Sequence, residues 1–225
     1  MKVTPRILAI IPARGGSKGI KDKNIVDING RPLIAWTIEA ALNSEYISKT
    51  IVSSDSDKII SIAKSLGSET LKRPLNLSQD ISTSIDVVFH AIKEISGYDF
   101  IILLQPTSPL RDSEDIDLAF TMMFKLNAKS CTSVCVAEKS PYWMYEINKE
   151  NNQLTNIMGS DIKYLRRQDT PDVYLLNGAI YIAEVNLLNK TKKLVSDETI
   201  GYIMQPEKSI DIDDINDLCK FRNLI

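Results

Sequence analysis

The stretch Ile7-Leu8-Ala9-Ile10-Ile11, followed at once by Pro12-Ala13-Arg14-Gly15-Gly16-Ser17-Lys18-Gly19, decides the fold of this chain. Five consecutive apolar residues are typical of a strand that is buried on both faces, as in parallel sheets. The glycines let the backbone bend and present N–H groups to an anion, while Arg14, Lys18 and Lys23 supply positive charge. We therefore expect a strand that runs into a phosphate-binding loop, and a triphosphate suits a loop of this charge.

A basic surface turn is the alternative interpretation of this stretch, because a glycine-rich loop alone is a weak signal. The P-loop signature needs Lys and Ser or Thr directly after the second of two spaced glycines, whereas Ser17 precedes Lys18 here and Gly19 follows it. The dinucleotide signature fails because Gly15 and Gly16 are adjacent. An ordinary P-loop ATPase is therefore not expected.

Composition narrows the class of protein. The chain has 225 residues, 44% hydrophobic and 25% charged, as in an ordinary soluble globular domain. A formal net charge of -2 leaves no broad basic surface for nucleic acid, so the N-terminal lysines are expected to serve a small anion. The apolar run at Ile7 to Ile11 is short and lacks a cleavage-site pattern, and no apolar stretch is long enough for a membrane span. We expect a cytoplasmic protein.

Apolar strand patterns alternate with helical ones along most of the chain. Strands are predicted at Ile7 to Ile11, Thr50 to Ser53, Phe100 to Leu104 and Ser130 to Ala137. Such a βαβα series predicts an α/β fold, doubly wound and Rossmann-like, with a mostly parallel sheet between helices and ligands at the carboxyl ends of the strands. The sequence indicates one domain over residues 1–225.

The alternation breaks between Glu138 and Asp172. Two aromatic and apolar segments, 141–147 and 153–157, flank a polar Asn-Lys-Glu-Asn-Asn turn. Residues 138–172 are therefore expected to form a protruding β-hairpin. An aromatic-rich excursion of this kind is typical of a surface buried against a second subunit, and packing within the chain is the alternative.

Polar side chains fall where the predicted strands end. Gln105, Thr107 and Ser108 follow the third strand and are interleaved with prolines, and Asn177 precedes a later strand. The prolines stiffen the segment, so that its polar groups offer fixed donors and acceptors to a sugar or a base. An ordinary polar loop is the alternative.

Two carboxylates near the C-terminus are candidate metal ligands. Asp211 and Asp213 are two residues apart, so they point to the same side of an extended segment. Mg²⁺ prefers hard oxygen ligands and is commonly shared between carboxylates and substrate phosphates. Asp214 and Asp217 are better explained as helix-start charges, an explanation that also extends to Asp213.

Taken together, five motifs resemble those of the acylneuraminate cytidylyltransferases, also called CMP-sialic acid synthetases. They are Ala-Arg-Gly-Gly-Ser-Lys-Gly-Ile with the later Lys-Asn, Leu-Gln-Pro-Thr-Ser-Pro-Leu-Arg, Arg-Arg-Gln-Asp, Asn-Gly-Ala-Ile-Tyr and Ser-Ile-Asp-Ile-Asp, in unbroken order from about Ile7 to Asp217. The resemblance implies a nucleotidyltransferase fold, and an enzyme that joins CTP to a nine-carbon 2-keto sugar acid and releases pyrophosphate. It also implies a homodimer that forms through the hairpin.

The resemblance assigns roles to individual residues. The CTP phosphates and ribose would be held by Arg14, Gly15, Ser17, Lys18, Lys23 and Asn24, and Arg73 and Ser84 would help to hold the nucleotide. The sugar acid would meet Gln105, Thr107, Ser108, Arg167, Gln168 and Asn177. Asp211 and Asp213 would hold Mg²⁺. Arg14, Lys18 and Lys23 would neutralise charge during transfer, and which group accepts the sugar's proton stays open, with Asp211 one candidate.

The sugar itself is open at this point. Tyr142 and Trp143 stand where some sialic acid enzymes carry a lysine, which favours a less polar substrate such as legionaminic or pseudaminic acid. Within the same fold, a 3-deoxy-manno-octulosonate cytidylyltransferase or another sugar nucleotidyltransferase is the alternative. From a different class, the chain would be a nucleotide-sugar binding protein without turnover. The basic loop and the Asp211 and Asp213 pair together favour catalysis.

Overall fold

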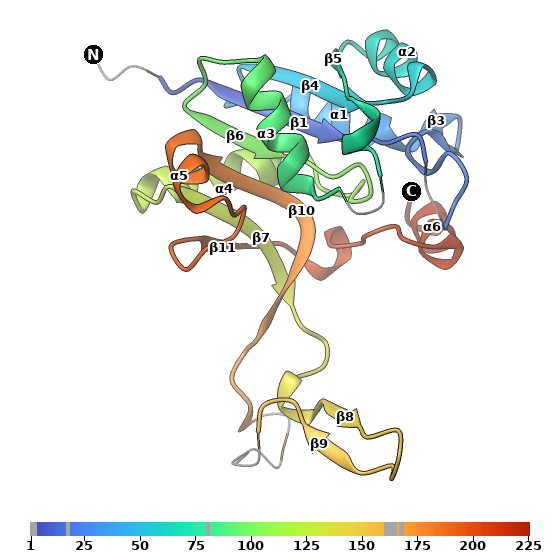
Figure 1. Ribbon diagram of the computed structural model, residues 1–225, viewed down its shortest axis with the longest axis vertical. Coiled ribbons are helices and arrows are strands. Elements are labelled where there is room, and N and C mark those ends of the chain that lie inside the picture. Colours follow the sequence, from blue (N-terminus) through green and yellow to red (C-terminus); the bar gives the residue numbers. More distant parts are fainter. Residues whose placement is uncertain (1–3, 17–18, 80–81, 160–165, 167–168) are drawn as a thin grey trace.

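A seven-stranded sheet forms the centre of the computed structural model, which describes residues 4–16, 19–79, 82–159, 166 and 169–225 (Figure 1). The strand order is β11-β7-β10-β6-β1-β4-β5. The strands are β1 (Ile7–Pro12), β4 (Lys49–Ser54), β5 (Glu69–Lys72), β6 (Phe100–Leu103), β7 (Ser130–Val136), β10 (Tyr174–Glu184) and β11 (Ile200–Ile203). Neighbouring strands pair in parallel except at β10, which runs antiparallel to β6 and to β7. The predicted mostly parallel sheet is confirmed.

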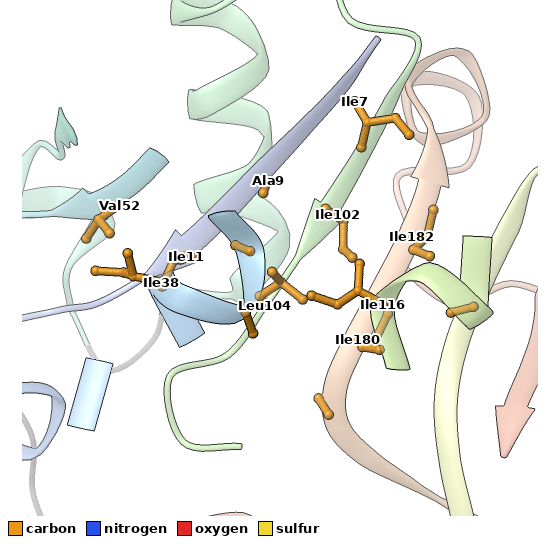
Figure 2. Close-up of a cluster of buried hydrophobic side chains, with 14 of the residues drawn as sticks. Ile7, Ala9, Ile11, Ile38, Val52, Ile102, Leu104, Ile116, Ile180 and Ile182 are labelled. Carbon is orange, nitrogen blue, oxygen red and sulfur yellow. The ribbon is translucent and has the colours of Figure 1, made fainter. Parts of the chain in front are cut away.

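Helices cover both faces of the sheet at β1, an interior strand that is apolar on both sides. In β1, Ile7, Ala9 and Ile11 point into one buried cluster, which includes side chains of α1 (Leu33–Leu42), α2 (Asp57–Ser65) and α4 (Ser113–Lys125) (Figure 2). Leu8 and Ile10 point into the opposite cluster, under α3 (Ser84–Glu94) and α5 (Val185–Thr191). Because alternate residues point to opposite faces and helices cover both faces, every residue of this strand is apolar.

The sequence marks helix starts through their caps. Thr83 and Asp86 form a reciprocal capping box at α3, and Ser56 caps α2 through the Ile59 N–H. Each pair satisfies backbone N–H groups that the first turn leaves without a helical partner. At α2 and α3, the polar residue that begins the helix therefore also fixes where the preceding loop ends.

The C-terminal helix α6 (Ile215–Leu224) packs over the short ribbon of β2 (Asp27–Ile28) and β3 (Arg31–Pro32), burying a third apolar cluster. Trp36 and Phe221 meet edge to face there, with ring centroids 5.5 Å apart. Ile212 is buried in the same cluster. This packing carries the segment before α6 to the residues that follow the glycine loop, although some 190 residues separate them in sequence.

The described residues between 138 and 172 leave the body of the protein as an arm. The outer halves of β7 and β10 pair as its stem, and β8 (Tyr145–Ile147) pairs antiparallel with β9 (Leu154–Asn156) near its tip (Figure 1). The predicted hairpin is therefore present. Within the described residues, no helix combines the length and the apolar character needed to cross a bilayer.

An irregularity in β10 separates the stem of the arm from the sheet. The pairing register with β7 shifts between Leu176 and Tyr181, and Gly178 within this bulge has φ of +75°. A left-handed residue in a bulge bends the strand and re-aims its neighbours. The bulge faces the carboxyl end of β6, where the candidate site lies.

Candidate active site

A cavity of about 450 Å³ opens at the carboxyl ends of β1 and β6. Its lining combines side chains that the sequence analysis singled out with others that it did not. The former are Arg14, Lys23, Asn24, Arg73, Ser84, Gln105, Thr107, Asp211 and Asp213; the latter include Pro12, Gly19, Leu77, Gln79, Ser82, Thr83, Val87 and Pro106. Residues from both ends of the chain thus meet in one polar pocket.

Lys23 joins the two ends of the chain directly. Its ammonium group donates to the Ile212 carbonyl oxygen at 2.7 Å and lies 3.2 Å from Asp213 Oδ1. The same two segments also approach each other at Gly19, where an added Cβ would lie 2.8 Å from the Asp213 carbonyl oxygen. The chain can approach this closely only because residue 19 has no side chain.

Asp211 is a half-buried carboxylate that lines the cavity. Burial raises the pKa of its carboxyl group above the usual range; a hydrogen bond from Thr107 opposes this, and the nearby Asp213 charge adds to it. One oxygen, Oδ1, is buried and lacks a hydrogen-bond partner among the described residues. A buried carboxylate oxygen without a partner is costly, so it suits a ligand that brings positive charge.

The cationic wall of the cavity is formed by Arg14 and Arg73. Arg73 is 5% exposed, and its Nε and Nη2 have no hydrogen-bond partner in the part of the chain that is described. Burial lowers the pKa of its guanidinium, the Asp55 carboxylate opposes that shift, and the charge of Arg14 adds to it. A buried guanidinium with unused donors is well suited to an anionic ligand.

Gln105 and Thr107 form the wall next to the β10 bulge. The Thr107 carbonyl oxygen accepts from the Ile212 N–H at 2.8 Å, which ties this loop to the aspartate segment. A Cβ on Gly178 would lie 3.0 Å from Gln105 Oε1 and 3.6 Å from Asp211 Oδ2. The missing side chain of Gly178 therefore leaves room for both polar groups.

Three predicted ligand-binding residues lie outside the lining of the cavity. Ser108 is fully buried, and the carboxamide of Asn177 is used internally by Ser133 and Ser209. The Gly15 N–H donates to Asp55 Oδ1 at 3.0 Å rather than into the cavity. Ser108 and Asn177 were expected to meet the sugar directly, but the structure gives them positions behind the wall, where Asn177 holds the segment that leads to Asp211.

Four other predicted site residues lie outside the described part of the chain, namely Ser17, Lys18, Arg167 and Gln168. Tyr142 and Trp143 are described, in a 3₁₀ turn of the arm (Pro141–Trp143), and they do not line the cavity of their own chain. The expectation that these two aromatics shape the substrate pocket is therefore not met within one chain.

Asp55 is a charged residue next to the cavity that sequence reasoning missed. It follows β4, holds the Gly15 N–H, and lies 3.9 Å from Arg73 Nη2, so it connects the glycine loop to the buried guanidinium. The signal that would have found it is the rule already applied to the other strands, namely that polar residues at the carboxyl end of a parallel strand converge. In the run Ser53-Ser54-Asp55-Ser56, Asp55 is the first residue after the strand.

Comparison with known proteins agrees with this geometry. Residues 8–222 match the family model described as cytidylyltransferase. The chain is 38% identical over 93% of its length to the N-acylneuraminate cytidylyltransferase of Escherichia coli O18:K1:H7, of which it covers 49%. It is 35% identical over 92% of its length to the CMP-N,N'-diacetyllegionaminic acid synthase of Legionella pneumophila, of which it covers 91%.

The fold also matches a solved structure. A CMP:2-keto-3-deoxy-manno-octonic acid synthetase complexed with CTP superimposes with a TM-score of 0.73 and 18% identity, covering 97% of this chain and 98% of the other. At that identity the likeness establishes the fold alone. The chain spans about half the length of the Escherichia coli relative.

Substitution of Gly178 tests how closely the bulge packs against Gln105. Gly30→Ala places a side chain at φ +83° with nothing within 4 Å, so it should lower the free energy of unfolding by about 1 kcal/mol from backbone strain alone. Gly178→Ala adds the contact with Gln105 and should cost about 2–4 kcal/mol. Urea unfolding measures both, and equal losses in the two variants would contradict the packing described here.

Proposed function

The chain belongs to the cytidylyltransferase family, and from this premise we propose that it transfers the CMP group of CTP to a nine-carbon 2-keto sugar acid, releasing pyrophosphate. The substrate class follows from two relatives, one named for N-acylneuraminate and one for N,N'-diacetyllegionaminic acid. The observation that carries the proposal is that one cavity brings Arg14, Lys23 and Arg73 together with Asp211 and Asp213.

The cations of the cavity suit a nucleoside triphosphate. The sugar's anomeric C2 hydroxyl would attack the α-phosphorus and release its proton, forming the new P–O bond while the bond from the α-phosphorus to the bridging oxygen of pyrophosphate breaks. Such a transfer depends on positioning and on compensation of charge rather than on a covalent enzyme intermediate. Arg14, Arg73 and Lys23 are the described groups that would hold the phosphates and offset the charge of the leaving group.

Different walls of the cavity would bind the two substrates. Ser84 and Arg73 lie on the side of α3, where the nucleoside would bind, and Gln105 and Thr107 lie on the side of the β10 bulge. The amide of Gln105 and the hydroxyl of Thr107 can orient a sugar acid through hydrogen bonds. Because Thr107 is also tied to Ile212, binding of the sugar would be linked to the position of Asp211.

Asp211 and Asp213 fit a magnesium ion. Within the described residues there is no group of three or more acidic, histidine or cysteine side chains that could hold a metal, so the phosphate oxygens of CTP would complete the ligand set. The buried Oδ1 of Asp211 is the atom that most needs a positive partner. When bound, Mg²⁺ would neutralise charge on the triphosphate and help pyrophosphate to leave. The two carboxylates would hold it, and the contact with Lys23 would keep Asp213 in place.

A homodimer that forms through the arm is part of the proposal. The arm exposes a set of large apolar side chains that a single chain leaves open to solvent. They are Trp143, Met144, Tyr145, Ile147, Leu154, Ile157 and Met158, each at least 43% exposed. Apolar surface gathered on a projecting hairpin is typical of an interface between subunits. A partner's arm is also the way in which Tyr142 and Trp143 would come near a sugar.

Pyrophosphate release with CTP tests the activity. The protein is assayed with CTP and Mg²⁺ against N-acetylneuraminate, N,N'-diacetyllegionaminate, pseudaminate and 3-deoxy-manno-octulosonate, and with ATP, GTP and UTP in place of CTP. We expect turnover with CTP and a nonulosonic acid, and the preferred acid identifies the sugar. Turnover confined to 3-deoxy-manno-octulosonate would contradict the substrate class. CTP binding without pyrophosphate release in the presence of any of these sugars would indicate a non-catalytic binding protein.

Thermal unfolding of Asp211→Asn tests the metal site without an activity assay. A raised pKa means that folding disfavours the charged carboxylate, so without metal at pH 7 the variant should melt above the wild type. With CTP and Mg²⁺ at about a hundredfold excess over Kd, the wild type should gain about 5 °C or more and the variant much less. Asp197→Asn, an exposed carboxylate, is the control. An equal gain in wild type and Asp211→Asn would rule out this site.

Light scattering tests the dimer. We expect the wild type at twice the chain mass of 25.2 kDa. Ile147 and Leu154 face each other across the hairpin, 59% and 61% exposed, so Leu154→Asp should place a charge in the interface and give a monomer. Leu75→Asp, on the body at 77% exposure, should leave the dimer intact. A monomeric wild type, or a dimeric Leu154→Asp, would contradict the arm as the interface.

A further inference from the structure

Arg111 is a buried cation beneath the cavity, and none of the chemistry described so far uses it. It is 1% exposed and is the largest fully buried side chain of the described protein. It follows the loop that carries Gln105 and Thr107 and directly precedes Asp112, the N-cap of α4. No carboxylate lies within ion-pair distance of it in the described part of the chain, and its Nη1 there has no hydrogen-bond partner.

The hydrogen bonds of Arg111 connect two walls of the cavity. Its Nη2 donates to Thr37 Oγ1 at 3.0 Å and to the Gln105 carbonyl oxygen at 3.4 Å, and its Nε donates to the Ala179 carbonyl oxygen at 3.5 Å. Ala179 lies in the β10 bulge, next to Gly178. One planar guanidinium therefore joins the loop after β6 to the bulge that leaves room for the Gln105 side chain.

The Gln105 carbonyl is held from three sides. Besides Arg111, it accepts from the Thr37 hydroxyl at 3.4 Å and from the Ser108 N–H at 3.3 Å. The last contact closes a turn over residues 105–108 with Pro106 at its second position, where proline presets the backbone. The main chain of residue 105 is thus fixed, so the direction of its side chain toward the cavity is fixed with it.

Burying such a cation is expensive. Burial lowers the pKa of the guanidinium to about 10, opposed by the charges of Asp115 and Asp112, so it stays protonated at neutral pH. Buried ionic groups are often replaceable by apolar residues of similar volume with little or no loss of stability. Its bonds hold the Gln105 carbonyl, behind the cavity wall, against the β10 bulge and α1, so the geometry of the site explains this buried cation better than the stability of the fold does.

We propose that Arg111 is a positioning residue for the sugar acid: its fork fixes Gln105 against the β10 bulge and so sets the geometry of the sugar-binding wall. This inference rests on the proposed function for the identity of the ligand. Arg111 does not line the cavity, and it acts through Gln105. Among the described residues, Arg14 and Lys23 of the phosphate-binding side are not hydrogen-bond partners of Arg111.

The kinetic test compares Arg111→Met with Arg111→Lys, using whichever nonulosonic acid the wild type turns over. Both variants should raise KM for the sugar acid about tenfold or more while KM for CTP changes less than about threefold, because neither side chain has the planar fork. An equal rise in both KM values, an unchanged KM for the sugar acid, or full recovery in Arg111→Lys would overturn the proposal. Thr37→Val removes one hydroxyl with little change in volume and should also raise the KM for the sugar acid. This variant replaces Arg111→Met in the test if Arg111→Met does not fold.

Amide hydrogen exchange separates this inference from the proposed function. In the ligand-free protein, the N–H groups of Ser108 and Ile212 bond to the carbonyls of residues 105 and 107 and should exchange about tenfold faster in Arg111→Met. The Ile60 N–H in α2, bonded to Ser56, should keep its wild-type rate. If the wild type shows no turnover, the proposed function fails while this measurement still decides the role of Arg111. Unchanged exchange at both amides would refute that role.

Discussion

The contact between the Lys23 ammonium group and the segment Ile212 to Asp213 is the interaction on which the site depends. It joins the two ends of the chain, because Ile212 and Asp213 lie 189 and 190 residues after Lys23. The close approach of Gly19 and the packing of α6 over Trp36 support the same junction. Without it, the cations of the first loop and the carboxylates of the last would face solvent separately, and neither would form a site for a triphosphate and its metal ion.

The antiparallel strand β10 provides the other half of the arrangement. A purely parallel sheet would bring only carboxyl ends to this edge, whereas β10 enters from the arm and reaches the cavity at its bulge. Gly178 leaves space there for Gln105 and Asp211, and Asn177 beside it anchors Ser209. The strand that forms the substrate wall thus also forms the stem of the arm. In the proposed dimer, one continuous strand would connect the interface to the sugar-binding wall.

Patterns that depend on local physics were predictable from the sequence. The apolar run of β1 and the helix-start carboxylates Asp214 and Asp217 follow from periodicity or from unsatisfied backbone groups, and the structure has them where the sequence indicates. The alternation of Asp211 and Asp213 about buried Ile212 was also correct, since both aspartates line one cavity.

What the sequence could not show depends on contacts between distant segments. A run such as Gly178 to Ile182 indicates a strand but not its direction, so the antiparallel placement of β10 was not foreseen. Ser108 and Asn177 are polar residues beside the site, and only the packing shows that they lie behind its wall. Arg111 is the last residue of the Leu-Gln-Pro-Thr-Ser-Pro-Leu-Arg motif. Its role was not predictable because its bonds go to Thr37 and Ala179, which are 74 and 68 positions away.

The most direct measurement is a crystal structure of the protein with CTP and Mn²⁺, in which anomalous scattering locates the ion. The account predicts one triphosphate between Arg14 and the aspartate pair, with the metal bound to Asp211 and to phosphate oxygens while Lys23 keeps its contact with Asp213. A triphosphate bound elsewhere, or an ion away from Asp211, would contradict it.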